Sequence, residues 1–90
     1  MKTGAKIIVK GLVQGVGYRY FCGKKADEFR IFGYVKNLFN GDVELGVEGE
    51  KNMIEDFINE LKIGPFNSSV KKISVEEVQF ENTYDDFRIY

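Results

Sequence analysis

The sequence lacks histidine and tryptophan altogether, and it has one cysteine and one proline among its 90 residues. Without histidine, the commonest general base and the commonest metal ligand are missing, so any chemistry must proceed without imidazole. The lone thiol, Cys22, cannot form an internal disulfide, which argues against a disulfide-stapled secreted domain. The short apolar run after Ala5 is broken by Lys10 and resembles neither a signal peptide nor a membrane span. We therefore expect a cytoplasmic protein with no membrane partner.

A large excess of charge of either sign is also missing. The 13 basic and 14 acidic side chains give a formal net charge of −1. Nucleic-acid binders usually carry a basic excess, so we expect no nucleic-acid partner, whereas a small anionic ligand needs only a local positive site. The apolar content of 43% is enough for a core, and the length predicts one domain over residues 1–90.

Apolar residues alternate in the manner of β-strands over residues 5–13, 31–38, 43–48, 70–80 and 87–90. Asn40-Gly41 is a strong turn signal between the second and third of these segments, and it predicts a hairpin. Within the fourth segment the inward-facing apolar positions change parity across Glu76-Glu77, which predicts a β-bulge there.

Helical spacing of apolar residues predicts two helices. The first follows Gly17 and has its apolar stripe at Tyr18, Phe21, Cys22, Ala26 and Phe29. For the second helix we predict an N-cap at Asn52, with Glu55 in the capping-box position, and an end at Gly64-Pro65.

The predicted order β-α-β-β-α-β, with a short extra C-terminal strand, indicates a ferredoxin-like α+β sandwich. In this fold an antiparallel sheet carries two helices on one face. The first two strands run in the same direction with the third between them, so their C-terminal ends share one rim, about 10 Å apart. The loop at residues 14–19 leaves one of these ends, and Asn37 lies near the other.

Residues at this rim suit a phosphate group. Gly15 and Gly17 allow successive backbone N–H groups to converge on an anion, and the start of the helix adds partial positive charge. Arg19 falls in the first helical turn, where a cation opposes the helix dipole unless an anion occupies the site. The alternative is a tight glycine turn followed by a solvated arginine.

Asn37 shares the strand parity of Val35 and so faces the core side of the sheet. Its carboxamide could orient a water molecule without deprotonating it. The alternative is an asparagine that flanks the Asn40-Gly41 turn and bonds to its own backbone.

These segments also resemble a known family. Gly11-Leu12-Val13-Gln14-Gly15-Val16-Gly17-Tyr18-Arg19 is similar to the acylphosphatase signature G-x-V-Q-G-V-x-[FY]-R at every defined position. A second signature is resembled by Gly33-Tyr34-Val35-Lys36-Asn37 with Gly41, Val43 and Gly49. The aromatic-rich ending from Phe87 to Tyr90 is family-like too, so the similarity extends over nearly the whole chain from Lys6.

The resemblance implies an enzyme that hydrolyses the carboxyl–phosphate bond of small acyl phosphates, with no metal or cofactor, to a carboxylate and inorganic phosphate. Inorganic phosphate would also inhibit it. By motif position, Arg19 would bind the phosphate and Asn37 would orient the water. The backbone of Gly15, Val16, Gly17, Tyr18 and Arg19 would form the cradle. We further expect a monomer.

Other polar residues receive structural interpretations. We expect Cys22 to be a small buried hydrophobe, Lys36 to point away from the site, and four glutamates to be solvated: Glu44, Glu48, Glu76 and Glu77. The main rival function is a non-catalytic ferredoxin-like binding module for RNA or a small molecule. The segment from Arg30 to Asn37 only partly resembles an RNA-recognition strand, because it lacks the defining glycine and aromatic and lies on the second strand.

Overall fold

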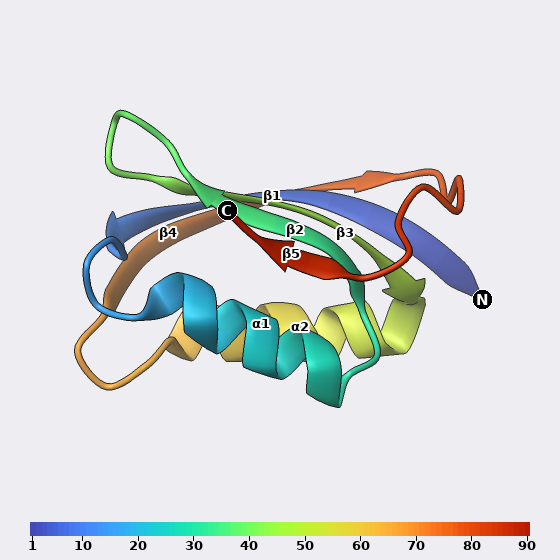
Figure 1. The fold of residues 1–90 in the computed structure, drawn as a ribbon, viewed down its shortest axis with the longest axis horizontal. Helices are drawn as coiled ribbons and strands as arrows, with labels where there is room; N and C mark the ends of the chain where they lie inside the picture. Colours follow the sequence, from blue (N-terminus) through green and yellow to red (C-terminus); the bar gives the residue numbers. More distant parts are fainter.

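The computed structural model describes residues 1–90, in which two helices cover one face of a single sheet (Figure 1). The elements in chain order are β1 (Lys2–Leu12), α1 (Tyr18–Glu28), β2 (Phe32–Asn37), β3 (Val43–Glu50), α2 (Lys51–Ile63), β4 (Ser69–Val78) and β5 (Phe87–Ile89). The predicted ferredoxin-like sandwich is therefore confirmed, including its short last strand. Neither helix is long and apolar enough to cross a membrane.

The strand order in the five-stranded sheet is β4-β1-β3-β2-β5. All neighbouring strands are antiparallel except β2 and β5, which pair in parallel from Gly33 with Phe87 to Val35 with Ile89. The chain reverses once between β4 and β5, so β5 runs opposite to β4 and in the same direction as β2. The sheet is thus mixed rather than wholly antiparallel.

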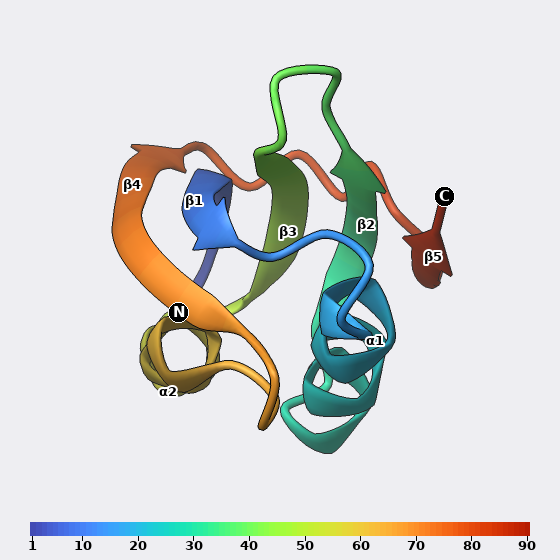
Figure 2. The same ribbon diagram turned by 90° about the vertical axis from the view of Figure 1, so that its left-hand side faces the viewer.

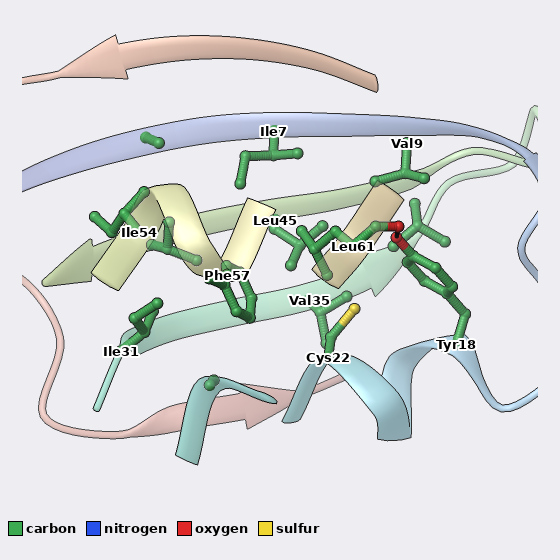
Figure 3. Packing of buried hydrophobic residues seen from close by; sticks show 14 of the residues in the cluster. Ile7, Val9, Tyr18, Cys22, Ile31, Val35, Leu45, Ile54, Phe57 and Leu61 are labelled. Carbon is green, nitrogen blue, oxygen red and sulfur yellow. Dashed lines mark hydrogen bonds between the residues drawn. The ribbon is translucent and has the colours of Figure 1, made fainter. Parts of the chain in front are cut away.

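The core lies between the sheet and the helices (Figure 3). Ile7 and Val9 of β1 pack with Leu45 of β3, and Phe57 of α2 lies opposite them. Fully buried side chains of the size of Val, Leu, Ile or Phe each contribute roughly 1.5–3 kcal/mol by leaving water. This apolar layer fixes the sheet against α1 and α2, and so fixes the rim from which the site is built.

Three details of the sequence prediction are wrong. Helix α2 begins at Lys51 with Glu50 as its N-cap, and Asn52 lies inside the helix, because β3 runs into α2 with no intervening loop. The register shift in β4 falls opposite Lys10 and Gly11, at Lys71, whereas pairing across residues 76–77 is regular. Apolar residues of this edge strand are half-exposed, so their pattern does not report a buried face.

Glu48 is the third exception, because it is buried rather than solvated. Its side chain points to the face opposite the helices, and only 7% of the residue is exposed. The carboxylate accepts hydrogen bonds from the backbone N–H groups of Glu81 (3.0 Å) and Thr83 (2.8 Å). It therefore holds the loop that connects β4 to β5.

Candidate functional site

The register of the sheet brings the two predicted halves of the site to one rim. Val43 of β3 pairs with Val9 of β1 on one side and with Asn37 of β2 on the other. Asn37 therefore lies two strand spacings, about 10 Å, from β1. After β1 the chain crosses this rim over β3 and enters α1 on the β2 side of the sheet (Figure 2). The loop between β1 and α1 consequently lies next to the end of β2.

The backbone of this loop offers a row of free donors. None of the N–H groups from Gly15 to Tyr20 donates to another atom of the protein, and the next one, of Phe21, bonds to the Gly17 carbonyl at 3.0 Å. Helix α1 has no side-chain cap and no acidic residue in its first turn. The row therefore combines free donors with the positive end of a helix dipole, which is the arrangement that binds anions.

Both glycines of the loop adopt left-handed backbone conformations, with φ of 74° at Gly15 and 79° at Gly17. A side chain is disfavoured in this region of φ by roughly 1–2 kcal/mol. A Cβ atom added at either position would meet no atom within 4 Å. The glycines are therefore required by backbone geometry and not by crowding, and they face open space where a ligand can approach.

Arg19 lies beside this row of donors. Its Nη1 donates to the main-chain oxygen of Tyr90. The N–H of Tyr90 in turn donates to the Val35 carbonyl at 2.9 Å. Tyr90 thus anchors the guanidinium to β2. A surface depression of about 280 Å³ is formed here by Gly15, Gly17, Arg19, Tyr20, Ile89 and Tyr90, with Val13 and Tyr18 at its base. Apart from the aromatic-rich ending, nothing in the sequence signals the contact of Tyr90 with Arg19.

Asn37 ends β2 with a polar atom that has no partner. Its Oδ1 is buried and accepts no hydrogen bond, and none of its side-chain atoms bonds to the following turn, so the turn-flanking alternative is not what the structure contains. A buried acceptor without a donor costs about 1–3 kcal/mol. Asn37 does not line the depression next to Arg19. The two are brought to the same rim, but they do not touch.

Gln14 bridges the two halves, and the sequence prediction gave it no role beyond membership of the first signature. Its Nε2 donates to the carbonyls of Leu38 (2.8 Å) and Asp42 (2.9 Å). Leu38 directly follows Asn37, and Gln14 directly precedes Gly15. One side chain therefore connects the loop with the free donors to the strand end that carries the carboxamide.

Other side chains near the site have structural roles. The Tyr18 hydroxyl is buried and donates to the Leu61 carbonyl at 2.7 Å, so the ring points into the core and only its backbone faces the loop (Figure 3). Burial raises the pKa of the Cys22 thiol well above its usual range, which suits the predicted hydrophobic role. Lys36 lies on the opposite face and pairs with Glu44 at 3.6 Å.

The structure contains no group of three or more His, Cys, Asp or Glu side chains that could hold a metal ion. The arrangement that it does contain is a set of backbone donors, one guanidinium and one unpaired carboxamide oxygen. Donors of this kind can hold a tetrahedral oxyanion, and the carboxamide can position a water molecule beside it.

Known proteins are similar to this chain in sequence and in fold. A family model described as Acylphosphatase matches residues 5–89. The acylphosphatase of Thermotoga maritima is 44% identical over 84 residues, which cover 93% of this chain and 92% of that protein. The probable carbamoyltransferase HypF of Methanocaldococcus jannaschii is 43% identical over 90 residues, which cover 99% of this chain but 12% of that protein. Among solved structures, the acylphosphatase from Bacillus subtilis superposes with a TM-score of 0.94 at 40% identity, covering 100% of this chain and 99% of that one.

Proposed function

The chain belongs to the acylphosphatase family, and we propose that it hydrolyses the carboxyl–phosphate bond of small acyl phosphates at the rim described above. Arg19 and the backbone of residues 15–19 hold the phosphate, and Asn37 orients the attacking water. The products are a carboxylate and inorganic phosphate. No metal or cofactor takes part.

The observation that carries this proposal is the row of unpaired N–H groups from Gly15 to Tyr20 beside the Arg19 guanidinium. Phosphoryl transfer through a loose transition state spreads charge over the equatorial phosphate oxygens, so it requires mainly positioning and charge stabilisation. Donors that are fixed before the substrate arrives supply both without reorganisation. Arg19 adds a forked pair of donors and a full positive charge.

We assign the orientation of the attacking water to the Asn37 carboxamide, which can both accept and donate a hydrogen bond and has no partner within the protein at Oδ1. A hydrogen bond to the carboxamide would hold the water with a lone pair toward phosphorus. The carboxylate leaving group is weakly basic, so it departs without a general acid. Because the site contains no histidine, we assign the second proton of the water to a phosphate oxygen of the substrate.

The acyl side of the substrate is selected loosely in this proposal. Arg19 is the one charged residue that lines the depression, and Tyr20, Ile89 and Tyr90 form much of the rest of its wall. An uncharged acyl group therefore finds apolar surface and no second cation. We also propose a cytoplasmic monomer that does not bind nucleic acid, in keeping with the net charge of −1 and the buried lone cysteine.

The rival RNA-binding function is not favoured. It would use the sheet face opposite the helices, where Tyr34 packs against Tyr84 and Tyr90. The Tyr34 hydroxyl donates to the Glu44 carboxylate at 2.8 Å. The three aromatic rings and the Glu44 carboxylate therefore already have partners within the protein, and Lys36 is paired with Glu44.

The test is an assay of benzoyl phosphate hydrolysis with a chelator present, on the wild type, Arg19→Gln and Arg88→Gln. Arg88 is a matched control, because it is an exposed arginine on β5 whose guanidinium pairs with Asp86 and does not line the depression beside Arg19. We expect the wild type to be active and Arg19→Gln to lose a factor of at least about 10²–10³ in kcat/KM. Arg88→Gln should stay within about twofold of the wild type. An inactive wild type, or equal effects of the two substitutions, would refute the proposal.

A further inference from the structure

We infer that Gln14 is a positioning residue, which sets the phosphate cradle at the working distance from the Asn37 carboxamide. The inference rests on the proposed function and extends it to a side chain that contacts neither the phosphate nor the water.

Both hydrogens of the Gln14 carboxamide are used. Nε2 donates to the Leu38 carbonyl at 2.8 Å and to the Asp42 carbonyl at 2.9 Å, in a half-buried setting. The two acceptors lie just beyond Asn37 and just before Val43, which is the residue paired with Asn37 across the hairpin. Gln14 is therefore hydrogen-bonded to the hairpin immediately next to the carboxamide that orients the water.

The turn from Leu38 to Asp42, to which Gln14 bonds, is held by several further hydrogen bonds. The Leu38 N–H donates to the Asp42 carbonyl at 2.8 Å. The Asp42 carboxylate, on a residue that is only 8% exposed, accepts from Lys10 at 2.7 Å and from Asn40 at 3.1 Å. Asn40 Oδ1 in turn accepts from the Asp42 N–H at 3.0 Å. The Gln14 amide thus bonds to a braced turn and not to a loose one.

The loop on the other side has no comparable support. From Val13 to Gly17, no other residue hydrogen-bonds to a distant part of the chain. The side chains of Val13 and Val16 pack on the core, which restrains the loop without fixing its direction along the rim. Gln14 therefore holds the Gly15 end of the cradle to the hairpin, whereas Tyr90 holds Arg19, at the other end of the cradle, to β2.

The chemistry makes the position of the Gly15 end matter. Water attacks in line only when oxygen and phosphorus are about 3–3.5 Å apart, and a displacement of about 1 Å can cost roughly 10²-fold in rate. Phosphate binding does not need the same precision, because it uses the loop donors and Arg19 alone. Loss of the bridge should therefore lower kcat and leave phosphate affinity largely intact.

Two substitutions test this, with benzoyl phosphate as substrate and inorganic phosphate as competitive inhibitor. Gln14→Leu removes both hydrogen bonds, and Gln14→Glu places a carboxylate against two carbonyl oxygens. At pH 7 we expect kcat to fall by about 10- to 100-fold in each, with the inhibition constant of phosphate within about threefold of the wild type. As pH is lowered, the new carboxyl group becomes protonated and can donate again. The kcat of Gln14→Glu relative to wild type should then recover in part, because a carboxyl group has one donor where the amide has two. The kcat of Gln14→Leu should not recover.

Asn40→Ala is the matched control. It removes the hydrogen bonds between Asn40 and Asp42, but it leaves the Gln14 bridge, the Leu38–Asp42 main-chain bond and the Lys10–Asp42 ion pair in place. Its kcat should stay within about twofold of the wild type, even if its melting temperature falls as far as that of Gln14→Leu.

The outcomes separate the two levels of the account. If the wild type hydrolyses benzoyl phosphate and Gln14→Leu matches its kcat, the positioning role is refuted while the proposed function stands. The role is equally refuted if phosphate affinity and kcat fall together, because Gln14 would then support binding and not the alignment of the water. A wild type without activity would overturn the proposed function itself.

Discussion

Two loops at opposite ends of the sheet differ in whether their backbone N–H groups have an acceptor within the protein (Figure 1). In the loop between β4 and β5, the N–H groups of Glu81 and Thr83 converge on the Glu48 carboxylate. Glu48 is buried within the fold, so this loop is supplied with an anion by the chain itself. Its donors are used up in holding the structure together.

In the loop between β1 and α1, the N–H groups from Gly15 to Tyr20 find no acceptor in the protein. No acidic residue lies in the first turn of α1, and the nearest charged side chain is the cation Arg19. Free N–H groups at the start of a helix, beside a cation, favour an anion from outside the chain. This difference between the two loops is the basis of the proposed phosphate site.

The largest effect on activity is expected from Asn37→Ala, which separates phosphate binding by the loop donors from orientation of the water. Removing the carboxamide leaves the row of donors and Arg19 in place, so phosphate should still bind while the water loses its orientation. We expect kcat to fall by about 10²–10³-fold, with the inhibition constant of phosphate nearly unchanged. Stability should be equal or slightly higher, because Oδ1 is a buried acceptor without a partner.

Steady-state kinetics and thermal unfolding of Asn37→Ala can be compared with Asn67→Ala, which changes an exposed asparagine in the loop between α2 and β4. That control should behave as the wild type in both measurements. Loss of phosphate affinity in Asn37→Ala would mean that Asn37 is a ligand of the phosphate, and its assignment as the water-orienting residue would be wrong.

A second prediction concerns the loop between β4 and β5, whose N–H groups bond to Glu48. Glu48→Gln keeps the shape of the side chain but removes the charge that two N–H groups share. It should lower the free energy of unfolding by about 1–3 kcal/mol, while kcat/KM measured well below the melting temperature stays at the wild-type value. Denaturant unfolding of Glu48→Gln and of Glu76→Gln, an exposed glutamate on β4, measures the difference. A loss of activity at full folding would show that the two ends of the sheet are coupled.

A smaller effect is expected from Gly17→Ala, paired with Gly41→Ala. Both glycines have positive φ, 79° and 96°, and an added Cβ atom meets no neighbour at either position. Each substitution should therefore cost roughly 1 kcal/mol of stability through backbone strain. Only Gly17→Ala should also weaken phosphate binding, because the strained backbone would redirect the neighbouring N–H donors and the added Cβ would lie in the open space where the ligand approaches. Calorimetric titration with phosphate distinguishes them, and equal affinities would argue against the cradle.

The smallest effect is predicted for Lys36→Gln. Lys36 is next to Asn37 in sequence, but it pairs with Glu44 on the far face of the sheet. The Lys36 side chain is half-exposed, the Glu44 carboxylate keeps its hydrogen bond from Tyr34, and the lysine charge is remote from the phosphate. We expect kcat/KM within about twofold of wild type. A tenfold loss would place Lys36 in the site and remove the contrast with Arg19.

Periodicity in the sequence was sufficient to predict the order of the elements. The alternation of Ile7 and Val9 with Ile8 and Lys10, and the helical spacing of Tyr18 and Cys22, follow directly from which face is buried. The shared rim then follows from the topology, which by itself predicts that Gly15 and Asn37 lie near each other.

What the sequence could not reveal are contacts between distant segments. Glu48 alternates as a solvated strand residue would, and only the folded chain brings the N–H groups of Glu81 and Thr83 to it. The bonds of Gln14 to the hairpin and of Arg19 to Tyr90 likewise join segments far apart in the chain. Local patterns also misplaced the cap of α2, because Glu50 is both the last strand residue and the N-cap.

The central claim is that the free donors between β1 and α1 are an anion site. A titration of the isotope-labelled protein with inorganic phosphate, followed by the amide resonances in NMR spectra, tests it most directly. We predict saturable shifts that are largest for the amides of Gly15 to Tyr20, with those of Glu81 and Thr83 unmoved because Glu48 already occupies them. Shifts that avoid residues 15–20, or that are absent at phosphate concentrations that inhibit the enzyme, would contradict the account.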